Sequence, residues 1–175
     1  MSRGPGIFIL LMALAVGVFF AVDAYLTRTG KLPPENLFKE THPAPGQLPQ
    51  NAKQLTTGVL PDSIIFDFVD AKDDRARADA AELWRDYWLP DEGWAVKIEE
   101  ARTEVDHVAL RCWMSRPSIV GGGYMLIAKL PAEEAGAYTA RMEVTIFGRI
   151  SQMQYENIGG LPYYRLIIEE ASVLR

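Results

Sequence analysis

Hydrophobic and polar residues follow different patterns along the chain, and each pattern predicts a different kind of segment. Residues 7–22 form an unbroken apolar run that continues past Asp23 to Leu26. As a helix, residues 7–26 would be about 30 Å long, which matches the hydrocarbon core of a bilayer. The run lacks the regularly spaced polar face of a soluble amphipathic helix. We therefore expect residues 1–6 to be a short tail and residues 7–26 to be a transmembrane anchor.

Two properties of this segment stay open from the sequence. The small residues around Asp23 would also suit cleavage after Ala24 by a signal peptidase, although the apolar run is long for a signal peptide. Basic residues flank both ends, so their count gives little guidance on orientation. Because a very short N-terminal tail before an apolar helix usually stays cytoplasmic, we expect a retained signal-anchor. The protein would then be single-pass in the cell membrane, with a periplasmic or otherwise extracytoplasmic C-terminal domain.

A proline-rich pattern follows the anchor. Residues 27–57 contain prolines at 33, 34, 43, 45 and 49, together with Gly30 and Gly46. Proline lacks a backbone N–H and interrupts both helices and central strands. Such a segment is typical of a semi-extended tether of up to about 3 Å per residue. We expect residues 27–57 to be a linker and residues 58–175 to be one globular domain.

The globular part begins with a helical pattern. Residues 63–69 (SIIFDFV) form a short apolar run that we interpret as β-capable, ending at Asp70. Apolar residues then recur at steps of three and four, which predicts one amphipathic helix over about 71–88. Asp70 would be its N-cap, and Pro90 would end it. The aromatic residues of its inner face favour core packing over a ligand platform.

From Trp94 onward, alternating apolar and polar residues predict five strands and one short helical segment. A glycine in the fourth strand, Gly148, predicts a bulge or bend. The expected order is three strands, a short helix, and two strands. The strands are expected at about 94–98, 108–113, 124–130, 144–150 and 163–168, the last running on towards Val173, with the helical segment at 132–138.

Charge and cysteine content then narrow the function classes. The chain carries a formal net charge of −5. The basic and acidic residues divide unevenly, giving +2 for residues 1–57 and −7 for residues 58–175. An acidic domain repels phosphate backbones, which argues against nucleic acid as a partner. The single cysteine, Cys112, excludes an intramolecular disulfide and a cysteine-rich metal cluster.

The strand pattern resembles a known fold family. TARMEVTIFGRI, a glycine loop and YYRLIIEEASVL resemble the last two strands of the OB-fold, and VALRCWM resembles a middle strand of the membrane-tethered and periplasmic tRNA-anti-like OB domains. The resemblance covers about residues 94–174 and implies a five-stranded Greek-key barrel. The expected fold class is therefore mainly β with α: an N-terminal transmembrane helix, a linker, one amphipathic helix and a five-stranded OB-like barrel. Because this domain is acidic, the resemblance does not imply nucleic-acid binding.

Catalytic and cofactor chemistry find little support in the residues. The haem chaperones of cytochrome c maturation have a similar plan, but they attach haem through a histidine near a tyrosine late in the chain. The two histidines here are His42 in the linker and His107 in TEVDH, which we interpret as a solvated hairpin turn. Cys112 falls on an apolar face, which favours a packed thiol over a nucleophile. We expect no enzyme, no metal and no cofactor.

The predicted barrel suggests where a partner would bind. In OB-type barrels, ligands meet the face of strands 2 and 3 and the loops beside it. By position, that surface would contain Arg111, Trp113, Arg116, Tyr124, Tyr155 and Asn157. The glycine-rich loops on either side are also apolar enough to contact a partner. The sequence favours a non-catalytic accessory or assembly subunit of a membrane or envelope protein complex. The alternative is a periplasmic protein that binds a small ligand or lipid headgroup.

Overall fold

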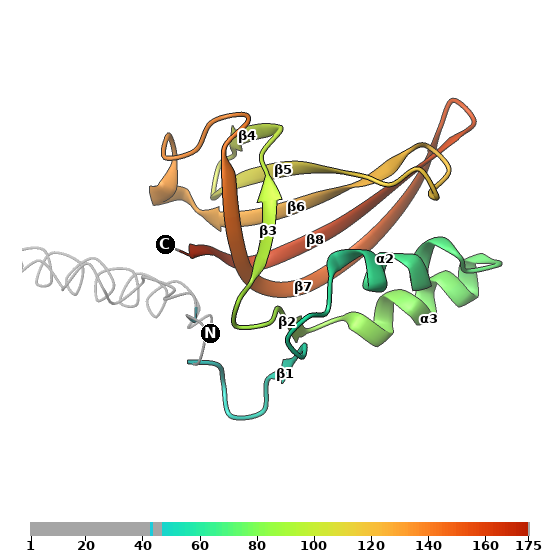
Figure 1. Cartoon of the computed structure of the whole chain (residues 1–175), viewed down its shortest axis with the longest axis horizontal. Coiled ribbons are helices and arrows are strands. Elements are labelled where there is room, and N and C mark those ends of the chain that lie inside the picture. The colour runs from blue at the N-terminus through green and yellow to red at the C-terminus, as the bar shows by residue number, and fades with distance from the viewer. Residues whose placement is uncertain (1–42, 44–46, 175) are drawn as a thin grey trace, which may run out of the picture. The chain divides into compact units, whose positions relative to one another are not determined.

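The computed structural model describes residue 43 and residues 47–174, which belong to one compact unit. This unit is mainly β with two α-helices (Figure 1). The predicted anchor at residues 7–26 lies outside the described residues. Within the described part of the chain, no helix has the length and apolar character needed to span a membrane.

Eight strands pair into one sheet. In order along the sheet they run β1-β2-β7-β8-β6-β5-β4, and β3 pairs with β7 beside this path. As a strand order, this is an open sheet with β1 and β4 at its ends. Most pairs are antiparallel, whereas β6 and β8 are parallel, as are β1 and β2. The strands are β1 (Lys53–Gln54), β2 (Tyr87–Trp88), β3 (Trp94–Lys97), β4 (Glu100–Thr103), β5 (His107–Ser115), β6 (Gly123–Pro131), β7 (Glu143–Ile158) and β8 (Leu161–Leu174).

The five strands predicted from alternation correspond to β3, β5, β6, β7 and β8. After β3, Ile98 and Glu99 lead into a short strand that was not predicted, β4. The fourth predicted strand, β7, extends well beyond residue 150, whereas β8 continues towards Val173 as predicted. β7 and β8 form a hairpin that turns at Gly159 and Gly160, both with positive φ. Two consecutive left-handed residues are the requirement of a type I′ hairpin turn, which glycine meets without strain. Tyr155 and Asn157, predicted in a loop, therefore lie within β7.

The connection between β3 and β4 joins two strands that are not neighbours in the sheet, β7 and β5. β3 pairs with β7, whereas β4 pairs with β5. Backbone hydrogen bonds continue both pairings through the connection, because the N–H of Ile98 donates to the Met142 carbonyl and that of Glu99 to the Arg111 carbonyl. The segment 94–103 therefore links the β7 and β5 strands across the molecule.

The prediction for residues 63–69 was wrong, because this run is helical. Helix α2 (Pro61–Val69) begins with proline in its first turn, where the missing N–H costs nothing, and carries Asp62 in the same turn. It buries Ile64, Ile65 and Phe68 in the core. The buried positions 61, 64, 65 and 68 follow a helical period, but in a run this short the isoleucine and phenylalanine residues favoured a strand.

The predicted helix over 71–88 is shorter than expected. Helix α3 (Asp74–Trp84) begins at Asp73, whose side chain accepts a hydrogen bond from the Ala76 N–H at 2.8 Å. Asp73, rather than Asp70, is thus the N-cap, and Tyr87 and Trp88 form β2. The two helices pack side by side against one face of the β7–β8 hairpin (Figure 1). The Trp84 indole N–H fastens α3 to α2 through Asp67 at 2.9 Å.

The end of the predicted linker is part of the domain. In β1, residues 53 and 54 pair with β2, and Leu55 is buried in the same core as Trp88 and Leu89. The short helical segment after β6 is a single 3-10 turn, η2 (Ala132–Glu134).

Gly148 marks an irregular place in β7, as predicted. The pairing of β7 with β8 shifts register between Phe147 and Arg149, and again between Ile150 and Gln152. A side chain on Gly148 would lie 2.7 Å from a methyl group of Ile168 and 3.0 Å from the Ala171 backbone. The absence of a side chain therefore permits the close approach of β8. The first shift places an extra residue in β8, between Ser172 and Glu169, and the second places one in β7, between Ile150 and Gln152.

Candidate functional site

Trp113 lies on the outer face of β5, where the sequence placed it. Its indole is 36 % exposed, and its ring stacks on Tyr163 of β8 with centroids 6.2 Å apart. The two strands are not adjacent, because β6 lies between them with Met125 opposite Trp113. The Trp113–Tyr163 stack therefore crosses β6, and aromatic and aliphatic side chains form a short row on the outer face.

Arg165 lies at the β8 end of this row, beside Tyr163. Its guanidinium forms two hydrogen bonds to the Glu156 carboxylate, at 2.8 and 3.0 Å, and lies 5.2 Å from the centre of the Tyr163 ring. Two parallel N–H···O bonds restrain a guanidinium more than a single contact does. We call Trp113, Tyr163 and Arg165 the aromatic row.

Arg111 shares this outer face but is paired with a neighbour. Its guanidinium donates to the Glu100 carboxylate at 3.1 Å, directly across the β4–β5 pair. Its charge is thus partly neutralised, and its side chain is partly buried. Arg111 therefore lies at the edge of the aromatic row with its charge already paired.

Tyr155 lies on the opposite face of the sheet. Its ring is 5.4 Å from that of Tyr164, and the Arg77 guanidinium of α3 lies 4.3 Å from its centre. Tyr164 in turn contacts Phe68 of α2 edge to face, at 6.3 Å. Tyr155 therefore covers the junction between sheet and helices, although 37 % of it remains exposed. It does not share a surface with Trp113.

Arg116 and Tyr124 also turn toward the helices. Both side chains bond to Asp62 at the start of α2: Arg116 through its Nε, and the Tyr124 hydroxyl at 2.8 Å. Tyr124 is fully buried, so its ring is not available to a partner. Burial, followed by the hydrogen bond to Asp62, raises the pKa of Tyr124. The hydrogen bond to Asp62 raises the pKa of Arg116.

Asn157 lies near the tip of the β7–β8 hairpin. Its side-chain oxygen accepts a hydrogen bond from the Gly160 N–H at 2.9 Å. This contact closes the turn from within, as asparagine commonly does in turns. Its observed role is therefore to shape the tip.

Two loops meet at this tip and expose aliphatic side chains. They are residues 117–122, between β5 and β6, and residues 157–162, at the β7–β8 turn (Figure 1). They approach so closely that a Cβ on Gly121 would lie 2.9 Å from the Pro162 carbonyl oxygen. Neither loop contains a charged residue. We call the exposed residues of these loops the apolar tip: Val120 at 67 %, Ile158 at 57 % and Leu161 at 63 % exposed.

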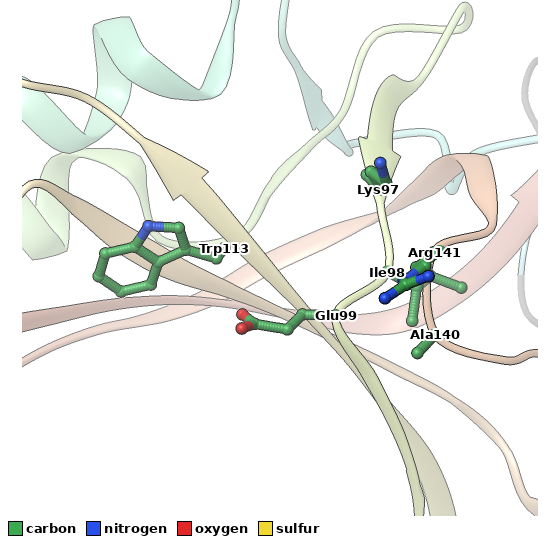
Figure 2. Close-up of a pocket in the computed structure, with 6 residues that line it drawn as sticks. All are labelled: Lys97, Ile98, Glu99, Trp113, Ala140 and Arg141. Atoms are coloured by element: carbon green, nitrogen blue, oxygen red, sulfur yellow. The ribbon is translucent and has the colours of Figure 1, made fainter.

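An open pocket of about 530 Å³ lies beside Trp113, at the β3–β4 connection (Figure 2). Sequence reasoning did not identify it, because its charged residues come from separate segments. Lys97 and Glu99 flank the buried Ile98, and Arg141 precedes β7. Their convergence depends on the pairing of β3 with β7, which no local motif reveals. The pocket is lined by Lys97, Ile98, Glu99, Trp113, Ala140 and Arg141.

The groups considered for metal or nucleophilic chemistry do not converge. His107, at the start of β5 rather than in the turn, contacts Asp106 at 2.6 Å and Glu104 at 3.3 Å. Among the described residues, no group of three or more such side chains could hold a metal ion. Cys112 is buried, and desolvation raises the pKa of its thiol to about 12. A thiol that stays protonated at neutral pH is a poor nucleophile.

Comparisons of the chain with protein-family models, with curated proteins and with solved structures find no match. The apolar tip, the aromatic row and the pocket are therefore the features from which a function can be inferred.

Proposed function

We propose that this chain is a non-catalytic, membrane-anchored accessory or assembly subunit, and that its apolar tip docks on a partner protein of a membrane or envelope complex. The observation that carries this proposal is the concentration of three exposed aliphatic side chains on two touching, uncharged loops. Interface cores are depleted of charge, and a gathered apolar patch is a common mark of an interaction site.

The partner's surface should complement this chemistry. A largely uncharged, aliphatic surface suits Val120, Ile158 and Leu161, since few fixed charges would have to be desolvated on either side. Arg116 at one edge of the tip and the aromatic row at the other would supply polar rim contacts. Trp113 and Tyr155 would make contacts on the two faces of the sheet below the tip, with Arg111, Tyr124 and Asn157 as supports.

The proposed fold of the domain is an OB-like barrel. The support is the strand pairing: segment 94–103 would be one bent strand, paired with β7 in its first half and β5 in its second. The parallel pairing of β6 with β8 fits the same scheme. One departure is that the two helices precede every strand except β1, whereas only the η2 turn lies between β6 and β7. Fold likeness alone carries no function.

The proposed location follows from the sequence. The apolar run at residues 7–26 would hold the protein in the cell membrane as a retained signal-anchor. The domain would then face the periplasm or another extracytoplasmic space, where the partner subunit would meet it.

The test is native sizing of the full chain after gentle detergent extraction from its own membrane. We expect the wild type to migrate in a stoichiometric assembly much heavier than its 19.5 kDa. The triple variant Val120→Ser, Ile158→Ser and Leu161→Ser should leave that assembly and remain folded, because all three side chains are mostly exposed.

A matched control removes three exposed aliphatic side chains from elsewhere on the domain. Leu60→Ser, Leu83→Ser and Val105→Ser change the same kind of residue outside the tip. This variant should stay in the assembly. Loss of the assembly in both triple variants, or in neither, would contradict docking through the tip.

A further inference from the structure

The charged side chains of the pocket beside Trp113 lie at two different ends of it. Figure 2 shows the Glu99 carboxylate directed toward the Trp113 indole, with Lys97 and Arg141 on the other side of Glu99. One end thus offers a carboxylate and an aromatic ring. The other end offers two cations.

These charges have no partners of their own. Within the described residues, Lys97, Glu99 and Arg141 form no side-chain hydrogen bond and no ion pair within 4.0 Å, although Glu143 lies opposite Lys97 in the β3–β7 pairing. The cations of the neighbouring sheet differ in this respect. Arg111, Lys129, Arg149 and Arg165 all pair with carboxylates. Among the described residues Arg102 of β4 also forms no ion pair, but it lies outside the pocket. The pocket is therefore a place where two unpaired cations from separate segments are available to an added anion.

The backbone holds Arg141 in place at the rim. The Arg141 N–H donates to the Ile98 carbonyl at 2.7 Å, and the Ile98 N–H donates to the Met142 carbonyl at 2.8 Å. Arg141 also has φ of 75°, a left-handed conformation that disfavours side chains larger than glycine or asparagine. Arg141 thus occupies a backbone position where glycine would be less strained.

We propose that this pocket binds a small ammonium-bearing alkyl phosphate, the chemistry shared by free phosphocholine and a phosphocholine lipid headgroup. The phosphate lies between Lys97 and Arg141, where it accepts charge-assisted hydrogen bonds. The ammonium lies between the Glu99 carboxylate and the Trp113 ring, which attracts cations through its π face.

Charge and size both fit this ligand. The pocket contributes two positive charges and one negative charge, and a phosphomonoester with one ammonium carries the complementary set. Its volume of about 530 Å³ falls in the range of small-molecule sites. The proposal is independent of docking through the apolar tip, because Lys97, Glu99 and Arg141 are not part of the tip.

Calorimetric titration of the full chain in a maltoside detergent tests the proposal. We expect phosphocholine to bind with a Kd at least about tenfold lower than that of choline or of inorganic phosphate alone, because each fragment engages one end only. Equal affinity for phosphocholine and inorganic phosphate would overturn the proposal.

Two variants locate the binding. Arg141→Gly removes the guanidinium and keeps a residue that tolerates positive φ, so the rim should keep its backbone shape. Glu99→Gln removes the carboxylate charge at the ammonium end. Each should raise the phosphocholine Kd by about fivefold or more. Arg102→Gln changes an exposed arginine of β4 outside the pocket, and its Kd should stay within about twofold of the wild type. Unchanged binding in the two pocket variants would overturn the assignment.

Glycerophosphocholine distinguishes the two sources of the ligand. It carries the phosphodiester of a lipid headgroup and one negative charge fewer than phosphocholine. Tighter binding of the monoester would indicate a free phosphorylated amino alcohol. Affinity for the diester at or above that for the monoester would indicate a lipid headgroup. Failure of both compounds to bind would refute the site and leave the tip proposal standing.

Discussion

The two faces of the sheet use similar residues for different purposes. On the face covered by α2 and α3, Tyr124, Tyr155 and Tyr164 meet helix residues through hydrogen bonds and ring contacts. On the other face, which no helix of the described residues covers, Trp113 and Tyr163 stack on each other. We call this the uncovered face. An aromatic side chain near a sheet edge therefore does not identify a binding surface. What distinguishes the two faces is which one the helices have already occupied.

The largest difference should appear when one aromatic residue is removed from each face. Phe68→Ala empties a fully enclosed position in α2 and should lower the free energy of unfolding by about 3–5 kcal/mol. Trp113→Ala on the uncovered face should cost roughly 2 kcal/mol, because part of the indole already contacts water. Urea unfolding of both variants measures this. Equal costs would mean that the aromatic row is as structural as the covered face.

The hydrogen-bonded network at Asp62 should give the next largest effect. Asp62→Ala leaves the buried Tyr124 hydroxyl without its acceptor and Arg116 without its counter-charge, at a cost of about 2–3 kcal/mol. Tyr124→Phe removes the hydroxyl itself and should cost about 1 kcal/mol. In the Tyr124→Phe background, Asp62→Ala should then cost less than it does alone. Additive costs in the double-mutant cycle would show that the network does not join α2 to the sheet.

Alkaline pH should also weaken the covered face. The pKa values of Tyr124 and Cys112 are raised in the folded state, so the unfolded chain loses these protons first. Their contribution to stability is complete below pH about 9. It then falls as pH rises, by at most about 1.4 kcal/mol per pH unit for each group, with Cys112 losing its part up to pH about 12. Unfolding free energies from pH 8 to 11 measure the slope, and Cys112→Ala should make it shallower. A slope unchanged by that substitution would contradict the role of the thiol.

Sequence patterns predicted the strands better than they predicted the site. Alternation identifies a strand when one face is buried and the other is wet, as in β5. It fails for α2, where a short run of isoleucine and phenylalanine suggests a strand. The exposed Ser63 and Asp67, four residues apart, and the start signals Pro61 and Asp62 indicated a helix instead. Along β7, Ile146 and Ile150 are buried, but so are Phe147, Ser151 and Met153, because irregular pairing with β8 interrupts the alternation. Extrapolation along that strand therefore could not place Tyr155.

The pocket illustrates a limit of a different kind. Lys97 and Glu99 are neighbours in sequence, but Arg141 is about forty residues away and reaches them only through the β3–β7 pairing. The left-handed backbone conformation of Arg141 has no signature in the sequence, since arginine does not favour that conformation. The apolar tip was easier to anticipate, because exposed aliphatic residues beside glycine pairs are unusual in a solvated turn.

The smallest effect should come from the ion pair of the uncovered face. Glu156→Gln breaks the two-bond contact with Arg165, and the half-exposed pair should lose only about 0.5 kcal/mol in urea unfolding. Added salt should reduce this difference further, because it screens an exposed pair. Glu100→Gln, which removes the single contact to Arg111, is the matched control and should cost no more. A loss above about 2 kcal/mol for Glu156→Gln would place Arg165 among the structural groups of the fold. The ion pair of the uncovered face would then contribute as much to the free energy of unfolding as the Asp62 network does on the covered face.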